Sequence, residues 1–343
     1  MNSRTLIALW KANMPPIVWG ASPAWIGAII LGLDGSSPEW DEVALFAVTI
    51  MAIQAITEFA NSYVDRSEDK VYFTSNPLVT GELSAEVAKT AFIMENLVIG
   101  ALVISLLVIT TNYPLIISIL VYWLAGIAYS LRPFKFKETI AGPLFIALVS
   151  VPLPISGWLV VAPLNKFIIA FAALFFLHSF GYGVTHKFRK TYHALRDGLI
   201  RLEQGSSVYN LKNIDLGMRV KTALTLEAIT TLGAFCLVPV FWHLGIFTIA
   251  LSVALLALPL PFTILSIAIR IRRPIENVQK AVMFMTMSWA LIILCFFAVA
   301  LSTLIPWGFA ILTCIVFLIV FAMLLRTVHP FGMKAFSAPW QEL

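Results

Sequence analysis

Long apolar stretches separated by short polar segments restrict this chain more than any other feature. Ten stretches of about 20 mainly apolar residues recur along its 343 residues. A helix rises ~1.5 Å per residue, so such a stretch crosses the ~30 Å hydrocarbon core of a bilayer. The pattern predicts an all-α, polytopic transmembrane helical bundle of nine to ten helices. The expected spans lie near 14–33, 41–64, 87–110, 114–131, 139–162, 167–187, 217–241, 244–269, 281–304 and 306–327.

The distribution of charge supports this number of spans. If the N-terminus is cytoplasmic and the spans alternate, 22 of the 23 Lys and Arg residues fall on the cytoplasmic side, and Lys166 alone falls on the other. This asymmetry follows the positive-inside rule. It predicts an integral, multi-pass membrane protein with both termini in the cytoplasm. The net charge of +5 is then a signal of topology, and no nucleic-acid partner is expected.

Polar residues are concentrated in the cytoplasmic loops. The two longest run from about 65 to 86 and from about 188 to 216, and we expect them to form a cytoplasmic cap. No long linker or low-complexity tract divides the sequence, so residues 1–343 are expected to form a single integral membrane domain.

The segment FANSYVDRSEDK (59–70) ends an apolar span with a polar stripe. Asn61, Asp65 and Asp69 are four residues apart and so share one helical face, which Glu58 and Gln54 continue toward the membrane. A charged side chain at membrane depth costs roughly 2.5–3.5 kcal/mol, so Glu58 should face a cavity or a partner. The alternative is a plain helix end, at which Asp65 and Asp69 pair with Arg66 and Lys70.

Carboxylates one turn apart at the mouth of a pocket suit a hard divalent cation. Mg²⁺ prefers oxygen ligands and commonly combines one or two carboxylates with waters and substrate phosphates. The stripe therefore points to a phosphorylated substrate whose other end lies in the membrane.

A basic segment, YSLRPFKFKE (129–138), follows the fourth span. Arg presents a planar fork to phosphate and Lys a compact charge, and Pro133 ends the helix. Alternatively, these charges serve only to set the topology. The candidate phosphate-binding residues are Tyr129, Arg132, Lys135 and Lys137.

These motifs resemble those of the UbiA superfamily of intramembrane prenyltransferases, in particular the branch that prenylates 1,4-dihydroxy-2-naphthoate. QAITEFANSYVDRSED (54–69) is similar to the first Asp-rich signature of the family, with Asn61, Asp65 and Asp69 in register. Ser62 replaces the first Asp, and Glu58 stands where the branch often has Asn.

Three further segments carry the resemblance over roughly the first 140 residues. NPLVTGELS (76–84) resembles an Arg-Pro-Leu element with Asn76 in place of Arg, and YSLRPFKFK resembles a Tyr-Ser-x-Pro-Pro element. WKANMPPIVWGASPAWIGA (10–28) resembles the opening Arg-Pro-rich helix, with Lys11 in place of Arg.

The second half departs from the family pattern. HALRDGLIRLEQGSS (193–207) fits the frame of the second Asp-rich signature, with Arg196, Asp197 and Gly205 in register, but Arg201 replaces the second Asp. A second possible register is HSFGYGVTH (178–186), which contains no acid. In either register one of the family's two metal sites is degraded, and we expect Arg201, or a neighbouring base such as Arg196 or Lys190, to replace the second metal.

The resemblance implies an enzyme that moves a polyprenyl group from its diphosphate to an aromatic or other lipophilic acceptor, with help from Mg²⁺. The implied partners are the polyprenyl diphosphate, the acceptor and membrane lipid. Catalytic and metal-binding roles fall to Asn61, Asp65, Asp69 and Asp197, and substrate-binding roles to Glu58, Lys11, Arg66, Tyr129, Arg132, Lys135, Lys137, Arg196 and Arg201.

Two alternatives remain. The first is a membrane terpene cyclase of the same family. The second is a non-catalytic lipid-binding or transport protein, which prolines within two of the spans would suit. The stripe of His178, Tyr182 and His186 is interpreted either as part of an acceptor pocket or as satisfied polar groups between helices, and the second interpretation is preferred.

Overall fold

A computed structural model describes residues 3–13, 15–72, 76–131, 133–201 and 207–328, and it confirms an all-helical membrane bundle. Within these residues, eight helical segments are long and apolar enough to cross a membrane. Two shorter apolar helices, Trp19–Leu33 and Trp307–Phe321, lie where the first and the tenth spans were predicted. The part of the chain that the structure describes contains no β-strand.

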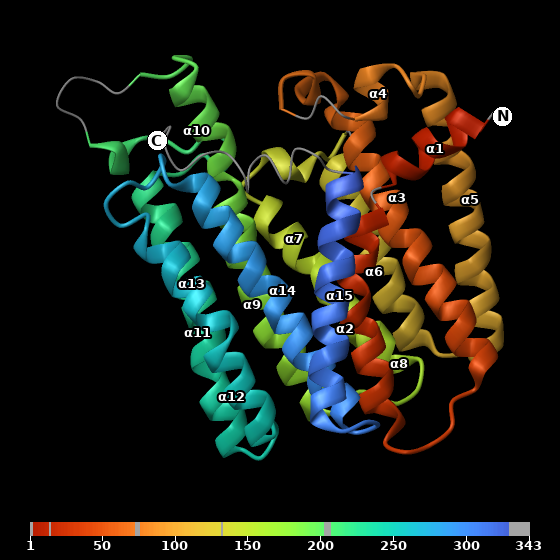
Figure 1. The fold of residues 1–343 in the computed structure, drawn as a ribbon. Helices are drawn as coiled ribbons and strands as arrows, with labels where there is room; N and C mark the ends of the chain where they lie inside the picture. The colour runs from red at the N-terminus through yellow and green to blue at the C-terminus, as the bar shows by residue number, and fades with distance from the viewer. Residues whose placement is uncertain (1–2, 14, 73–75, 132, 202–206, 329–343) are drawn as a thin grey trace. The chain divides into compact units, whose positions relative to one another are not determined.

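The elements follow the predicted order along the chain (Figure 1). They are α1 (Ser3–Ala12), α2 (Pro15–Leu33), α3 (Trp40–Tyr72), α4 (Pro77–Thr80), α5 (Ala85–Thr110), α6 (Tyr113–Ser130), η1 (Phe136–Glu138), α7 (Gly142–Ser150), α8 (Pro152–Leu159), α9 (Lys166–His186), α10 (Phe188–Arg196), η2 (Val208–Asn210), α11 (Val220–His243), α12 (Ile249–Ala257), α13 (Pro259–Ala268), α14 (Val278–Ser302) and α15 (Trp307–Val328).

Two predicted spans are interrupted at prolines. The fifth is divided into α7 and α8 at Pro152, and the eighth into α12 and α13 at Pro259. Proline has no backbone N–H and its ring clashes with the preceding turn, so it ends one helix and begins the next. Each pair still supplies a segment long enough for one crossing.

The chain divides into two compact units, which are described separately. The first contains α1 to α6, α8 and α15. The second contains η1, α7, α9 to α13 and most of α14. The prediction of a single domain stays a prediction.

In the first unit, α3 packs against α1, α2, α4, α5 and α6, while α2 packs against α8 and α15. Glycines allow the closest approaches. A Cβ atom at Gly126 of α6 would lie 2.4 Å from Thr57 Oγ1 of α3, and one at Gly157 of α8 would lie 2.3 Å from the carbonyl oxygen of Trp25 in α2. These helices therefore pack with their backbones unusually near one another.

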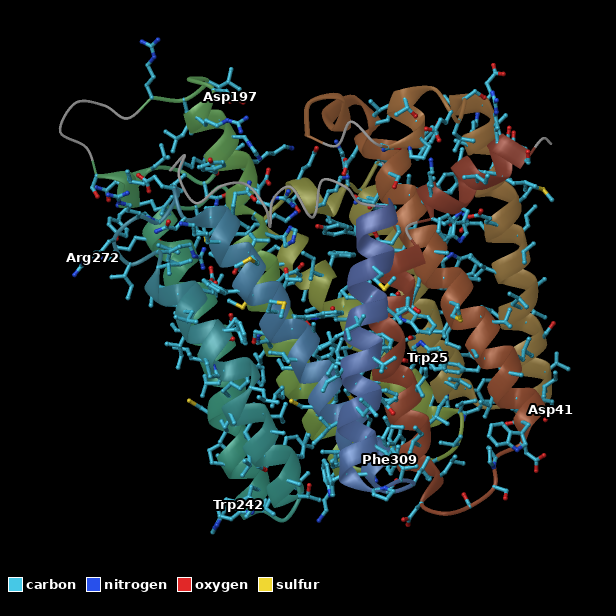
Figure 2. The ribbon with its side chains drawn as sticks, in the orientation of Figure 1. Trp25, Asp41, Asp197, Trp242, Arg272 and Phe309 are labelled. Carbon is cyan, nitrogen blue, oxygen red and sulfur yellow. The ribbon has the colours of Figure 1, made fainter. Side chains whose placement is uncertain are left out.

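In the second unit, α9 packs against both α7 and α11, and α11 lies beside α12 and α13 (Figure 1). Gly183 of α9 meets Pro143 of α7, where a Cβ atom would come within 2.8 Å of the proline Cα. Figure 2 shows Asp197 and Arg272 at one end of this unit and Trp242 at the other.

We predict that Gly157→Ala destabilises the folded protein by about 1–3 kcal/mol, because the new methyl group meets rigid backbone rather than a flexible side chain. The measurement is the midpoint of thermal unfolding in detergent. Gly233→Ala in α11 is the control, since a Cβ atom there meets nothing within 4 Å. An equal loss of stability in both variants would contradict the close α2–α8 contact.

Candidate active site

The polar stripe lies on one unbroken helix. α3 has 33 residues and is therefore about 50 Å long, well beyond the ~30 Å of hydrocarbon. The helix continues beyond the predicted membrane span to Tyr72, as the placement of Asp65 and Asp69 on one helical face requires, and nothing in the polar segment interrupts its backbone hydrogen bonds. Asn61, Asp65 and Asp69 thus share one face at the polar end. The side chain of Asp69 lies outside the described part of the structure.

α6 brings a second stripe against α3. Tyr122, Gly126 and Ser130 are four residues apart and share one face of α6. Ser130 donates a hydrogen bond to Asn61 Oδ1 at 3.4 Å, and Gly126 packs against Thr57. Tyr122 interacts electrostatically with Glu58. The α3 stripe therefore faces α6 rather than lipid along this length.

Two departures from the family motifs lie in contact with each other. Ser62 is buried, and its hydroxyl donates to the carbonyl oxygen of Ala12 at 3.2 Å. The Ser62 carbonyl in turn accepts a hydrogen bond from the side chain of Asn76 at 3.0 Å. Asn76 also caps α4 by accepting from the Leu78 N–H. A carboxylate at position 62 would face a carbonyl oxygen, so serine suits this position better than aspartate.

Two predicted cations of the first unit have partners. Lys11 forms an exposed ion pair with Glu82 at 3.1 Å. Arg66 donates to the Tyr63 carbonyl oxygen at 2.6 Å, and its guanidinium lies 4.5 Å from the centre of the Tyr63 ring. Both cations are held near the polar end of α3, and an exposed ion pair is weak enough for phosphate to replace its carboxylate.

The basic segment is divided between the two units. Tyr129 is half-buried near the end of α6 in the first unit, and Arg132 lies outside the described residues. Lys135 and Lys137 belong to the second unit. Lys137 is largely buried, and its carbonyl oxygen accepts a hydrogen bond from Lys187, while Lys135 pairs with Glu138.

Glu138 forms ion pairs with two lysines of the second unit. Besides Lys135, it pairs with Lys190 at 3.5 Å, and Lys190 also approaches Asp215 at 3.9 Å. Burial alone would raise the pKa of Glu138, but the two ammonium groups outweigh burial and hold that pKa below its usual value of 4.5. Glu138 thus remains an anion that pairs with one candidate phosphate-binding lysine, Lys135, and with Lys190, a candidate replacement for the second metal.

The second signature lies on two consecutive helices. HSFGYGVTH (178–186) forms the end of α9, whereas HALR forms the end of α10. Asp197 caps α10 and is exposed, and its hydrogen bond from Arg196 at 2.8 Å lowers its pKa. Arg201 is exposed, and Gly205 lies outside the described residues. The structure therefore places Asp197 about ten residues beyond the end of the long apolar helix α9.

The buried polar groups near α9 bond to one another. His178 Nε2 lies 2.9 Å from Ser288 Oγ and 3.3 Å from Thr263 Oγ1, and Tyr182 bonds to His186 at 3.0 Å. The His178 bonds join α9 to neighbouring helices, while His178 Nδ1 has no hydrogen-bond partner among the described residues.

Other polar side chains inside predicted spans of the first unit also have partners. Glu95 accepts a hydrogen bond from Asn13 at 3.3 Å, and Asn96 accepts one from the Trp123 indole at 3.0 Å. Neither side chain is left to bind a substrate.

A buried ion pair fixes the start of α10. Glu227 of α11 and Arg270, just after α13, are almost fully buried and bonded to each other. The Arg270 guanidinium also lies 5.2 Å from the centre of the Phe188 ring. The pair thus joins α11, the end of α13 and the first turn of α10.

Sequence reasoning missed the partners that other helices supply. Ser130, Tyr122 and Arg270 were not among the predicted site or core residues. The polar and small residues at 122, 126 and 130 share a helical spacing within an apolar span, which was the available signal for the first two. Arg270 offered no signal, because it is one of several cations at a span end.

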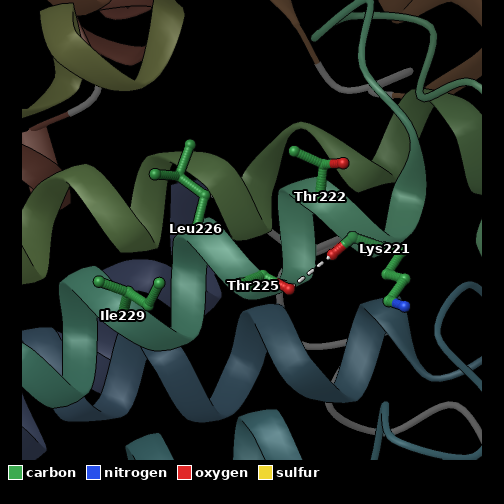
Figure 3. A pocket seen from close by; sticks show the side chains of 5 residues that line it. All are labelled: Lys221, Thr222, Thr225, Leu226 and Ile229. Atoms are coloured by element: carbon green, nitrogen blue, oxygen red, sulfur yellow. Dashed lines mark hydrogen bonds between the residues drawn. The ribbon is translucent and has the colours of Figure 1, made fainter.

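An open groove of about 360 Å³ lies on the outer face of α11 (Figure 3). All of its lining residues come from this one helix, so nothing closes over it, and it contains no carboxylate. We therefore do not place the active site there. Its lining residues are Lys221, Thr222, Thr225, Leu226 and Ile229.

The residues of the α3 stripe fit a magnesium ion. Asn61 and Asp65 present an amide and a carboxylate oxygen one turn apart on a continuous helix, and Asp69 follows after another turn. Among the residues that the structure describes, no group of three His, Cys, Asp or Glu side chains gathers into a metal site. A bound Mg²⁺ would therefore need waters or substrate phosphates to complete its coordination.

The fold and this site define an integral, multi-pass membrane protein with an oxygen-rich site at the polar end of one helix. The sequence profile of the UbiA prenyltransferase family matches residues 20–288, so the chain belongs to this family. No protein of curated function matches the sequence.

Solved structures share the fold. A structure of digeranylgeranylglyceryl phosphate synthase is similar with a TM-score of 0.61 and 19% identity, over 87% of this chain and 99% of the other. A structure of a UbiA homologue from Archaeoglobus fulgidus is similar with a TM-score of 0.53 and 18% identity, over 83% of this chain and 99% of the other. The structure of this homologue bound to GPP and Mg²⁺ has a TM-score of 0.54 and 16% identity, over 83% of this chain and 99% of the other.

We predict that Arg270→Met destabilises the protein by about 3–5 kcal/mol, because it leaves the buried Glu227 carboxylate without its cation. The double variant Glu227→Leu/Arg270→Met should recover most of this loss. Denaturant unfolding in mixed micelles measures the free energy of unfolding of the single and the double variant. Arg272→Met is the matched control, since Arg272 is exposed two residues away. A double variant as unstable as Arg270→Met would contradict a buried pair.

Proposed function

We propose that this protein transfers a polyprenyl group from its diphosphate to an aromatic or other lipophilic acceptor at the cytoplasmic side of a membrane. The observation that carries the proposal is the unbroken helix α3, which presents Asn61, Asp65 and Asp69 on one face at its polar end. Membership of the UbiA family supports it. So do the structures of the Archaeoglobus fulgidus homologue bound to GPP or DMAPP with Mg²⁺.

Asn61, Asp65 and Asp69 would hold Mg²⁺, with Asp197 contributing from the second signature. When bound, Mg²⁺ neutralises the charge that develops on the departing diphosphate. The prenyl chain is apolar and would lie among the helices, whereas the diphosphate needs charge and water and would lie at the mouth.

In this proposal the candidate cations neutralise the remaining phosphate charge. In this proposal Lys11 and Lys135 exchange their carboxylate partners, Glu82 and Glu138, for phosphate oxygens. Tyr129, Arg66, Arg132 and Lys137 would complete the diphosphate-binding set.

Cations would also replace the second metal. Arg196 and Lys190 already pair with acids of the second unit, while Arg201 is exposed. Any of the three could move to a phosphate, because exposed ion pairs are worth only about 0–1 kcal/mol. This arrangement would let one Mg²⁺ suffice.

The cytoplasmic segments 65–86 and 188–216 would cover the site and exclude water from the allylic cation. In the structure these segments include the end of α3 and the short elements α4, α10 and η2. The excess of Lys and Arg on the same side favours cytoplasmic N- and C-termini.

We predict that purified protein releases pyrophosphate from geranylgeranyl diphosphate only when Mg²⁺ and an acceptor are both present, and that Asp65→Asn lowers the rate about 10²-fold or more by removing a metal ligand. Asp41→Asn is the control, because Asp41 is an exposed acid at the other end of α3.

Other outcomes separate the alternatives. Release that needs Mg²⁺ but no acceptor would indicate a cyclase or a hydrolase. No release with any prenyl donor, or equal rates for the two Asp variants, would contradict the proposed function.

A further inference from the structure

Glu58 is a carboxyl group at membrane depth that has neither a hydrogen-bond partner nor a cation beside it among the described residues. It lies eight residues before the end of the span at Arg66, which is about 12 Å along the helix. Its side chain is only partly buried, and none of the described residues forms a hydrogen bond or ion pair with it. An ionisable residue within a span marks a functional site by default, because leaving it unpaired costs roughly 2.5–3.5 kcal/mol.

A second acceptor atom lies one turn away. Gln54 is buried with 3% of its surface exposed; its side chain bonds to Tyr122, while its Oε1 atom has no hydrogen-bond partner among the described residues. Gln54 and Glu58 are four residues apart and share one face of α3. Three adjacent oxygen atoms, one from the amide and two from the carboxylate, can therefore accept hydrogen bonds that the described protein does not supply. A ligand with hydroxyl groups could donate hydrogen bonds to these oxygen atoms.

Other buried carboxyl groups in the spans differ in this respect. Glu95 is bonded to Asn13, and Glu227 is paired with Arg270. Glu58 is thus the described membrane-depth carboxyl that is left for a ligand.

The elements packed against α3 bring no cation to Glu58. α2 and α4 contain no titratable group, and on α1 Lys11 is paired with Glu82 while Arg4 is exposed. On α5, Glu86 and Lys89 are exposed and Glu95 is bonded to Asn13. From α6, Tyr122 interacts electrostatically with Glu58. On α3 itself the nearest charged groups are Asp65 and Arg66. A ligand that brought a second negative charge next to Glu58 would therefore meet no cation on these elements to neutralise it.

We propose that Glu58 binds a hydroxyl group of the prenyl acceptor and takes its proton, and that the acceptor is therefore an uncharged, hydroxyl-bearing lipophilic molecule. This inference rests on the proposed function. A carboxylate at position 58 disfavours an acceptor that itself carries a carboxylate.

The proposed transfer breaks one bond and forms one bond. The bond between the first prenyl carbon and the diphosphate oxygen breaks, and the diphosphate leaves with the electron pair. The nucleophilic oxygen, or the ring carbon activated by it, supplies the electron pair of the new bond. The hydroxyl proton passes to the Glu58 carboxylate, and for bonding at a ring carbon the ring proton returns to the oxygen by tautomerisation. One proton is released per transfer.

Two acceptors that share one ring system test this. 1,4-Dihydroxynaphthalene is uncharged, and 1,4-dihydroxy-2-naphthoate adds a carboxylate. We expect the wild type to favour the uncharged acceptor about tenfold or more in kcat/KM. Glu58→Gln should lower the rate with the uncharged acceptor by about 10²–10⁴-fold. It should also reduce the difference in kcat/KM between the two acceptors. Glu58→Asp should retain the rise of rate with pH that marks a base, whereas Glu58→Gln should lose it.

Controls separate this role from a structural one. Glu58→Gln should keep wild-type thermal stability and Mg²⁺-dependent binding of radiolabelled geranylgeranyl diphosphate. Glu95→Gln should leave acceptor preference and the pH profile unchanged. A preference of the wild type for the naphthoate, an unchanged pH profile in Glu58→Gln, or loss of donor binding in that variant would overturn the inference alone. Absence of pyrophosphate release by the wild type with either acceptor would overturn the proposed function together with it.

Discussion

Lipid offers no hydrogen bonds, so a polar side chain within a span must find its partner inside the protein. Most described polar groups in the spans do so. His178 bonds to Ser288, Glu95 to Asn13, and Glu227 to Arg270. On α3, the Glu58 carboxylate and the Gln54 carbonyl oxygen have no hydrogen-bond partner among the described residues and lie one turn apart. Polar groups thus join helices at several places, whereas these two acceptors lie on the stripe that leads to Asn61 and Asp65.

The fold could be predicted from the sequence because lipid imposes a length and a charge rule on every span. The all-helical bundle is confirmed, and the segments that can span a membrane follow the predicted order. The breaks at Pro152 and Pro259 could have been placed from the chemistry of proline. The continuation of α3 past the lipid was already implied by placing Asn61, Asp65 and Asp69 on one helical face, whereas its last residue, Tyr72, has no sequence signal.

The candidate site was predictable along α3 and much less so across helices. Spacing alone places Asn61, Asp65 and Asp69 on one face, and the unbroken helix supports it. Contacts between distant segments, such as Ser130 with Asn61, depend on how α3 and α6 pack and have no local signal. The same holds for the cations: the sequence showed them as a basic segment, whereas the structure gives Lys11 and Lys135 acidic partners. The replacement of Asp by Ser62 is likewise explained by contacts with distant residues, the Ala12 carbonyl and Asn76, which the structure shows.

Mapping where a prenyl diphosphate binds would test the central claim most directly. A geranylgeranyl diphosphate analogue with a photoreactive group near its first isoprene unit can be cross-linked to the protein, with and without Mg²⁺, and the adducts located by mass spectrometry. The account predicts Mg²⁺-dependent adducts on α3 and α6, around Glu58, Asn61 and Tyr122. Adducts on the outer groove of α11, or labelling that does not depend on Mg²⁺, would contradict it.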